Sequence, residues 1–250
     1  MLKSVRHDGI GIAALLAVAA VSIALATAAV AAPPDPRGDP DQFRRDIEAL
    51  NKKALPEGES LAQAVGSAVD IDARLRGRCA SKKFSLGPLE PVSLDGMITA
   101  LIAQGQIENA WLVSVRLDDC PPADPIRVLL LRGPDGEKLQ AIFAGQGESL
   151  TWPTLARDAL RATVAKVVAR LRVEDPRCAP PDLTQIGIRI ASRSTDLGPN
   201  VYGLRLKGNW TELWAFAPCG HDVAVPISFT TDGQGGAYWS IDVSKIVYRP

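Results

Sequence analysis

Few residues of this sequence have the types and spacing that chemistry needs. The chain contains four cysteines and two histidines, and His7 lies in the N-terminal segment described below. A Ser-His-Asp or Cys-His site would therefore have to use His221. The sequence contains no Gly-x-Ser-x-Gly elbow, no Ser-x-x-Lys motif and no phosphate-cradling glycine loop. We assign no catalytic residue and no cofactor.

His221 is followed by Asp222, and this pair has the chemistry of half a metal site. No second group of ligands is visible, and no cysteine pair has Cys-x-x-Cys spacing. A histidine on the surface of a hairpin is the simpler interpretation. The sequence therefore predicts no metal site.

Paired carboxylates are the remaining candidates, and Glu212 is the most informative of them. By strand parity it shares a face with Trp210, Trp214 and Phe216, which together form the candidate functional patch. An inward carboxylate is costly unless it is paired or protonated. It could contact a ligand or act as a general acid. Alternatively it forms a salt bridge to an arginine such as Arg205, or the strand is an edge strand with reversed faces. We favour these structural interpretations.

The cysteines carry the strongest signal of organisation. Cys79 and Cys120 are 41 positions apart, and so are Cys178 and Cys219. A tryptophan precedes the second cysteine of each pair by nine positions. Several matched spacings in one order indicate a tandem duplication. An even number of cysteines in an exported chain favours disulfides over a zinc site.

The duplication also selects a disulfide pairing. Four cysteines allow three connectivities, and sequence alone does not normally choose among them. Two copies that fold alike should each close their own bridge, which predicts Cys79–Cys120 and Cys178–Cys219. The competing arrangement joins one copy to the other and needs the two helix ends to meet.

Hydrophobic alternation places an antiparallel meander after a helix in each copy. The helices are predicted around residues 59–76 and from Pro153 through Leu171, where proline occupies a favoured first-turn position. The copies align through three pairs of strand residues: Trp111/Trp210, Val128/Ile227 and Ala141/Ile241. The fold class is therefore α+β, with two tandem related units, each a helix plus an antiparallel β-meander, and one disulfide per unit.

The copies diverge between their cysteines. Residues 93–104 of the first copy have helical periodicity, whereas residues 186–190 and 202–206 of the second alternate as strands. The predicted organisation is a signal peptide at 1–31, a leader at 32–55 that can hold a short helix over 42–53, a first α+β repeat at 56–150 and a second at 151–250.

The N-terminus predicts the compartment. Lys3 and Arg6 precede an uncharged stretch over residues 10–32, and the stretch contains the small-x-small pattern Ala29-Val30-Ala31. This is typical of a cleaved secretory signal, so we expect a periplasmic or secreted protein. The alternative is an uncleaved membrane anchor, because the stretch is long enough to span a bilayer. Basic stop-transfer residues do not follow it, which favours cleavage.

The net charge argues against nucleic acid or an anionic membrane as a partner. Cleavage after residue 31 removes two of the 28 basic residues and one of the 28 acidic residues, which leaves 26 and 27. A nearly neutral chain has no pervasive field to attract nucleic acid or an anionic membrane. No second hydrophobic run is long enough to span a membrane after signal cleavage.

The C-terminal region carries a distinctive motif, Trp210-Thr-Glu-Leu-Trp214, then Cys219-Gly220, Val225-Pro-Ile-Ser-Phe-Thr230 and Gly235-Gly-Ala237. It resembles the motif of a family of uncharacterised exported proteobacterial proteins. The likeness covers about the last fifty residues closely. The resemblance implies an exported bacterial protein and supplies no activity and no catalytic residue.

These observations favour one function and leave a second open. The missing catalytic motifs, the predicted disulfides and the predicted internal repeat favour a non-enzymatic binding or structural protein. Its partner would be an unidentified protein or envelope component. The alternative is a carboxylate-dependent envelope hydrolase that uses Glu212 and Asp222. A pocket near residues 210–216 that holds two carboxylates would favour the hydrolase.

Overall fold

A computed structural model describes residues 55–76, 79, 81–120, 124–178, 183 and 185–249, together with Arg45 and Ala49. The predicted signal peptide at 1–31 lies outside these residues, and so does the predicted leader at 32–55 apart from Leu55, Arg45 and Ala49. The last two are helical and are the only described residues of the short helix predicted over 42–53. Both repeats belong to one unit, Ala31–Pro250. Within the described part of the chain, no helix is long and apolar enough to cross a membrane.

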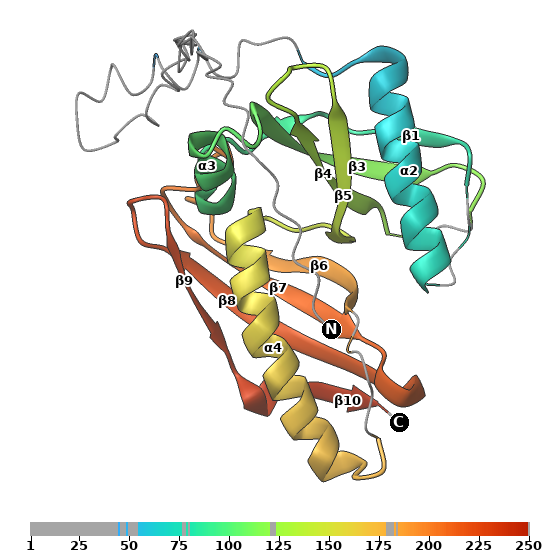
Figure 1. Cartoon of the computed structure of the whole chain (residues 1–250). Coiled ribbons are helices and arrows are strands. Elements are labelled where there is room, and N and C mark those ends of the chain that lie inside the picture. Colours follow the sequence, from blue (N-terminus) through green and yellow to red (C-terminus); the bar gives the residue numbers. More distant parts are fainter. Residues whose placement is uncertain are drawn as a thin grey trace, which may run out of the picture. The chain divides into compact units, whose positions relative to one another are not determined.

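The first repeat packs a helix on a five-stranded antiparallel sheet (Figure 1). Its elements are α2 (Gly58–Arg76), β1 (Phe84–Leu86), β2 (Glu90–Pro91), α3 (Gly96–Ala103), β3 (Asn109–Leu117), β4 (Ile126–Arg132) and β5 (Leu139–Gln146). The strand order is β1-β3-β4-β5, and β2 also pairs with β3. The helix predicted over 93–104 is α3.

The second repeat has the same plan without a counterpart of α3. Its elements are α4 (Pro153–Glu174), β6 (Gln185–Arg193), β7 (Asn209–Phe216), β8 (Asp222–Thr231), β9 (Ala237–Ile241) and β10 (Val247–Arg249). The strand order is β10-β8-β7-β6, and β9 also pairs with β8. The predicted α+β class, with a helix, an antiparallel sheet and one disulfide in each unit, is confirmed.

The strand registers of the two repeats match. Trp111 lies opposite Leu130 in the first sheet, and Trp210 lies opposite Phe229 in the second, so both strands keep an offset of 99 positions. In the third strand the register pairs Leu130 with Ala141 and Phe229 with Trp239. Ala141 therefore corresponds to Trp239, and the predicted alignment with Ile241 is wrong by two residues. The hairpin over 232–236 is one residue shorter than its counterpart over 133–138.

One predicted strand is absent from the second repeat. Residues 202–206 alternate in sequence, but the chain turns back on itself there, and Val201 and Leu204 form an isolated bridge. Tyr202 and Gly203 have φ values of 50° and 98°, which a β-strand cannot accommodate. The strand predicted over 186–190 is the central part of β6.

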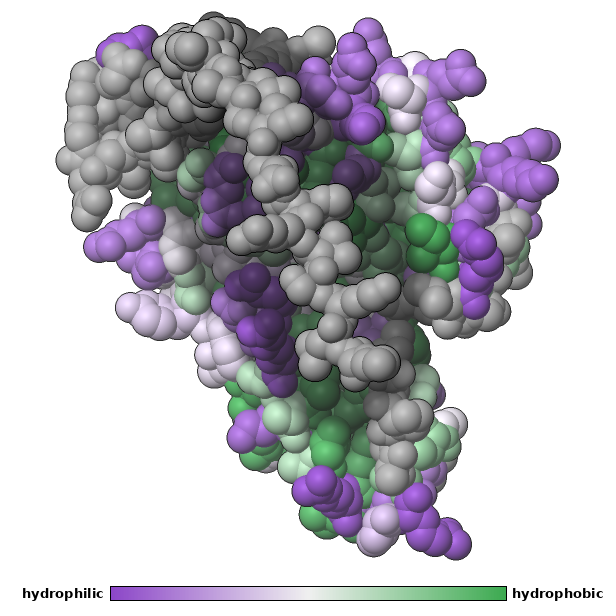
Figure 2. All heavy atoms as spheres, viewed as in Figure 1, coloured by the Kyte–Doolittle hydropathy of each residue, from purple (hydrophilic) through white to green (hydrophobic). Residues whose placement is uncertain are grey.

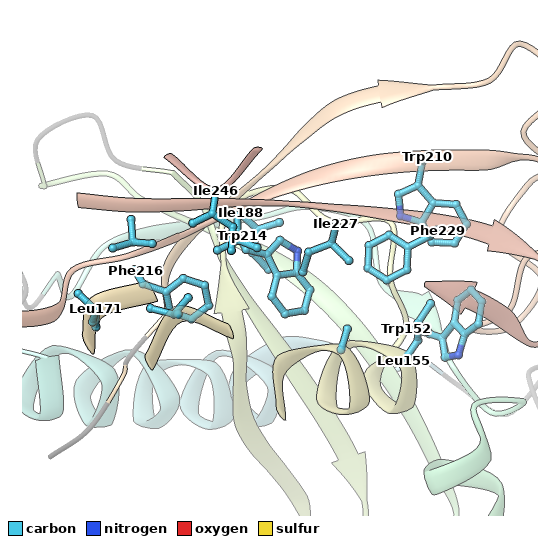
Figure 3. Close-up of a cluster of buried hydrophobic side chains, with 14 of the residues drawn as sticks. Trp152, Leu155, Leu171, Ile188, Trp210, Trp214, Phe216, Ile227, Phe229 and Ile246 are labelled. Atoms are coloured by element: carbon cyan, nitrogen blue, oxygen red, sulfur yellow. The ribbon is translucent and has the colours of Figure 1, made fainter. Parts of the chain in front are cut away.

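Each helix covers one face of its own sheet. In the first repeat, Val65 and Val69 of α2 pack on the face that carries Trp111, Val128 and Leu130. The second core is richer in aromatic rings, and Figure 3 shows it between α4 and the strands of the second sheet. The opposite face of the first sheet packs against α3. In the view of Figure 2, hydrophobic atoms remain visible over α4 and the second sheet, and hydrophilic side chains project from the rim.

Both predicted disulfides are present. Cys79 is bonded to Cys120 and Cys178 to Cys219, each with a Cα–Cα distance of 5.9 Å. In each repeat the bridge ties the chain after the helix to the end of the tryptophan-bearing strand. In the chain-entropy model, closing a loop of this length stabilises the fold by about 4 kcal/mol per bridge.

The linker between the repeats, residues 147–152, is held by backbone contacts with both of them. The Gly147 N–H donates to the Pro125 carbonyl at 2.6 Å, and the Glu148 N–H donates to the Ile188 carbonyl at 3.0 Å. Gly147 has a φ of 90°, and a Cβ atom there would lie 1.9 Å from the Ile188 oxygen. Only glycine fits this close approach.

The buried carboxylate of Asp95 caps helices from both repeats. Its Oδ1 accepts hydrogen bonds from the N–H groups of Met97 at 3.0 Å and Ile98 at 3.2 Å, in the first turn of α3. Its Oδ2 accepts the Thr154 N–H at 2.7 Å, and its Oδ1 accepts the Thr154 hydroxyl at 2.8 Å, in the first turn of α4. One side chain thereby satisfies N-terminal donors of two helices.

We expect Asp95→Ala to lower the free energy of unfolding by about 2–4 kcal/mol, because it removes two caps and leaves buried N–H groups unpaired. Urea unfolding measures the loss. Thr154→Ala, which keeps the backbone N–H bond, should lose about 1 kcal/mol. The exposed control Asp118→Ala should stay within about 0.5 kcal/mol of the wild type. An Asp95→Ala protein as stable as this control would contradict the double-cap role.

Candidate functional site

The predicted functional patch lies in the hydrophobic core. Trp210, Glu212, Trp214 and Phe216 alternate along one face of β7, and none has more than 1% of its surface exposed. Figure 3 shows the three aromatic members facing α4. Trp210 stacks on Phe229 with their ring centroids 5.0 Å apart. The side chains of this patch therefore offer no surface to a partner.

The Glu212 carboxylate binds the linker that precedes α4. Its Oε1 accepts the N–H groups of Leu150 at 2.7 Å and Thr151 at 3.2 Å. The Ser149 hydroxyl donates to both carboxylate oxygens, at 2.9 and 3.0 Å. Glu212 thus binds three consecutive linker residues, two through their backbone N–H groups and one through its hydroxyl.

Two indole N–H groups complete the environment of Glu212. Trp210 Nε1 donates to Oε1 at 3.1 Å, and Trp214 Nε1 donates to Oε2 at 2.8 Å. Every group around the carboxylate donates a hydrogen bond, which is the environment that an ionised carboxylate needs when it is buried. Both oxygens are occupied, so the structure does not present Glu212 as a free general base.

The predicted alternatives for Glu212 have a clear outcome. The residue does face the core, so β7 is not an edge strand with reversed faces. Arg205 is not its ion-pair partner, since none of the ion pairs among the described residues includes either of them. Arg205 instead donates from Nη1 to the Gly198 carbonyl at 2.6 Å.

Asp222, the second carboxylate of the hydrolase hypothesis, is remote from Glu212. Glu212 lies opposite Ile227 in the β7–β8 ladder, and Asp222 lies five residues further along β8, where it pairs with Arg249. At about 3.3 Å per residue, the two positions are separated by about 16 Å along the strand. Carboxylates that share one catalytic task lie less than about 10 Å apart.

A buried arginine lies on the other side of the linker. Arg127 of β4 has 8% of its surface exposed, and its Nη2 donates to the Thr151 carbonyl at 2.9 Å. No carboxylate among the described residues forms an ion pair with it. Burial lowers the pKa of Arg127, and the charges of Glu212 and Glu90 act in the opposite direction. The guanidinium is therefore largely removed from water, and the charges of Glu212 and Glu90 act on it without a direct ion pair.

Arg127 lines a cavity that both repeats help to form. Its volume is about 230 Å³, and its walls include polar residues from β2, β3, β4 and the linker and an apolar residue from β6: Glu90, Ser114, Arg127, Glu148, Ser149 and Ile190. An adjoining hollow of about 20 Å³ shares Glu90, Arg127 and Ser149 and adds Asn200 and Arg205. We call the two together the inter-repeat cleft.

Arg205 brings a second guanidinium to the cleft. Burial lowers the pKa of Arg205, Glu90 raises it and Arg193 lowers it further. Its Nε is buried without a hydrogen-bond partner. On the opposite wall, Glu90 accepts a hydrogen bond from Asn200 Nδ2 at 3.0 Å. The cleft therefore contains two cations that are only partly compensated and a carboxylate that is held in place.

His221 lies away from this cleft, beside the second disulfide. Its Nε2 is 3.2 Å from Asp175 Oδ2, and its ring is 5.0 Å from that of Tyr248. The hydrogen bond from His221 lowers the pKa of Asp175, and the Arg177 N–H adds to the effect. The described residues include no cluster of three histidine, cysteine, aspartate or glutamate side chains that could hold a metal ion.

The sequence did not identify Arg127, Glu90 or Arg205 as site residues. Arg127 alternates with Ile126 and Val128, so strand parity places it on the face opposite the α2 core, which is a solvent position for an isolated unit. Only the packing of the second repeat against that face buries it. The available signal was a charged residue near the start of a central strand whose next four residues are apolar.

No family model matches the chain, and neither the curated proteins nor the solved structures gave a significant match.

We expect Glu212→Gln to lower the free energy of unfolding by about 2–4 kcal/mol. The glutamine NH2 group would replace one acceptor oxygen, and at this buried site it would face N–H and O–H groups that also donate. Chemical denaturation measures the loss. Glu174→Gln is the matched control, since Glu174 forms a partly exposed pair with Arg170 at 2.5 Å and such pairs contribute about 0–1 kcal/mol. Equal stability of the two variants would show that the linker does not depend on Glu212.

Proposed function

We propose that this chain is an exported, non-enzymatic binding protein and that its ligand occupies the inter-repeat cleft against Arg127. The observation that carries the proposal is the buried guanidinium of Arg127, which lines a cavity and has no ion-pair partner among the described residues. Taking a charge out of water costs several kcal/mol unless it is paired. A ligand with a negatively charged group would supply the missing partner.

The cleft has the composition of a binding site. Small-molecule sites are concave, lined by apolar residues and a few convergent polar groups, and commonly lie between domains. Leu112 and Ile190 provide apolar wall, and Arg127, Ser114 and Ser149 provide polar groups. The linker wall is rigid because Glu212 binds three of its residues.

A binding role is favoured over carboxylate-dependent hydrolysis by three observations. Both oxygens of Glu212 are already hydrogen-bonded, and Asp222 lies at the far end of β8. The single histidine of the described part, His221, is engaged with Asp175 and does not line the cleft.

Export is the second half of the proposal. The two disulfides fit an oxidising compartment, where such bonds persist. The secretory pattern of the N-terminus and the resemblance of the C-terminal motif to exported proteobacterial proteins point in the same direction. We therefore propose the periplasm or the extracellular space as its location.

Sodium acetate is the simplest probe of the cleft. One carboxylate that pairs with one arginine gains about 1.5–3 kcal/mol, so binding should be millimolar or weaker. We expect acetate to raise the melting temperature of the full chain above that in sodium chloride of equal ionic strength. Arg127→Met should abolish this response. The exposed control Arg116→Met, on the same face of the first sheet, should retain it.

The stability of Arg127→Met provides an independent check. Removing an unpaired buried charge that serves binding should change the free energy of unfolding by no more than about 1.5 kcal/mol, whereas breaking a structural buried ion pair costs about 3–5 kcal/mol. A large loss, or a wild-type protein that does not respond to acetate, would overturn the assignment of the cleft as the binding site.

A further inference from the structure

The charges that line the larger cavity of the inter-repeat cleft differ in their exposure to solvent. Arg127 is 8% exposed and lies in the wall, whereas Glu90 and Glu148 line the same cavity and are solvent-exposed residues. No ion pair among the described residues joins Arg127 to either glutamate. The cavity is therefore lined by a buried cation and by two solvent-exposed carboxylates.

Both glutamates are held by contacts from the second repeat. The Glu90 carboxylate accepts a hydrogen bond from Asn200 at 3.0 Å. The backbone of Glu148 is fixed by its N–H bond to the Ile188 carbonyl at 3.0 Å. The Glu90 carboxylate is thus positioned by a side chain of the second repeat, and the backbone of Glu148 is positioned where its side chain lines the same cavity.

We propose that the ligand of this cleft is a small zwitterion of the amino-acid or dipeptide class, with its carboxylate on Arg127 and its ammonium group near Glu90 and Glu148. This inference rests on the proposed function of the cleft as a binding site. A guanidinium offers a planar pair of donors that matches a carboxylate. An ammonium group has three hydrogen-bond donors, which can bind the exposed carboxylates of Glu90 and Glu148.

Ligands of other charge fit the cleft less well. A simple anion gains the contact with Arg127 but remains near two carboxylates, which repel it. A simple cation meets Arg127, and a neutral ligand leaves the guanidinium without a counter-charge. The volume of about 230 Å³ lies below the range of about 300–1,000 Å³ that holds drug-sized ligands, so the occupant is small. Leu112 and Ile190 form an apolar part of the cavity wall, which can contact a short side chain of the ligand.

Four probes separate these charges in the full chain. L-Alanine and L-alanyl-L-alanine carry both charged groups, N-acetyl-L-alanine lacks the ammonium group, and L-alanine amide lacks the carboxylate. Isothermal titration measures the affinity of each. We expect at least one zwitterion to bind about tenfold to a hundredfold more tightly than either comparator, which is the contribution of one charged hydrogen-bonded contact. Whichever of L-alanine and L-alanyl-L-alanine binds more tightly shows whether the cleft fits an amino acid or a dipeptide.

Variants assign the two ends of the ligand. Arg127→Met should remove binding of every probe that carries a carboxylate. The double variant Glu90→Gln/Glu148→Gln should bind N-acetyl-L-alanine and the zwitterion with equal affinity, because it lacks the two carboxylates that favour an ammonium group. Glu137→Gln, on the exposed 133–138 hairpin outside the cleft lining, is the matched control and should keep the wild-type preference.

The outcomes distinguish the inference from the function on which it rests. Equal affinity of the wild-type protein for N-acetyl-L-alanine and the zwitterions, with binding still lost in Arg127→Met, would overturn the zwitterion inference and leave the cleft as an anion-binding site. Failure of every carboxylate probe, acetate included, would overturn both. A preference for zwitterions that persists in Glu90→Gln/Glu148→Gln would overturn the role given to the two glutamates.

Discussion

A carboxylate that is fully removed from water must have its charge compensated by hydrogen bonds, and Glu212 obtains them from the segment that joins the two repeats. Three linker residues and two indoles donate to it. This contact fixes where α4 begins, and Asp95 then binds the first turn of that helix from the other repeat. The cleft owes its wall to these contacts, because Ser149 and Thr151 belong both to the Glu212 network and to the cavity around Arg127.

Among the described residues, the network around Glu212 has no counterpart in the first repeat. The position of Glu212 is occupied by Val113 in the first repeat, and the adjoining Trp111 keeps its indole N–H without an acceptor among the described residues. The guanidinium of Arg132 lies 4.9 Å from the centroid of the Trp111 ring instead. In the first repeat the helix only covers the sheet, and the apolar Val113 occupies this position. In the second repeat the sheet also binds the linker, and the carboxylate of Glu212 supplies the acceptor. The two repeats thus share a frame and differ at the position that joins them.

The unequal burial of charge in the cleft follows from the same packing. One face of the first sheet is covered by α2, and the other is divided between α3 and the second repeat. Arg127 lies on the divided face, beyond the part that α3 covers, so it meets the linker and the β6–β7 loop region. Because those segments present carbonyl groups and no paired carboxylate, the guanidinium is desolvated without being neutralised. That imbalance supports a binding role more strongly than any motif in the chain.

The sequence by itself determined the frame. Cysteine spacing and strand alternation depend on local periodicity and on duplication, and they predicted both disulfides, α2, α4, the two meanders and the inward direction of Glu212. Local patterns did not predict the turn at Tyr202 and Gly203, whose positive φ values override an alternating sequence, or the one-residue shift of the third strand after the shorter hairpin. The partners of Glu212, the double cap at Asp95 and the burial of Arg127 were decided by tertiary structure alone. Each includes a contact between residues at least 24 positions apart, and no periodicity within one element specifies which face of one repeat will meet the linker of the next.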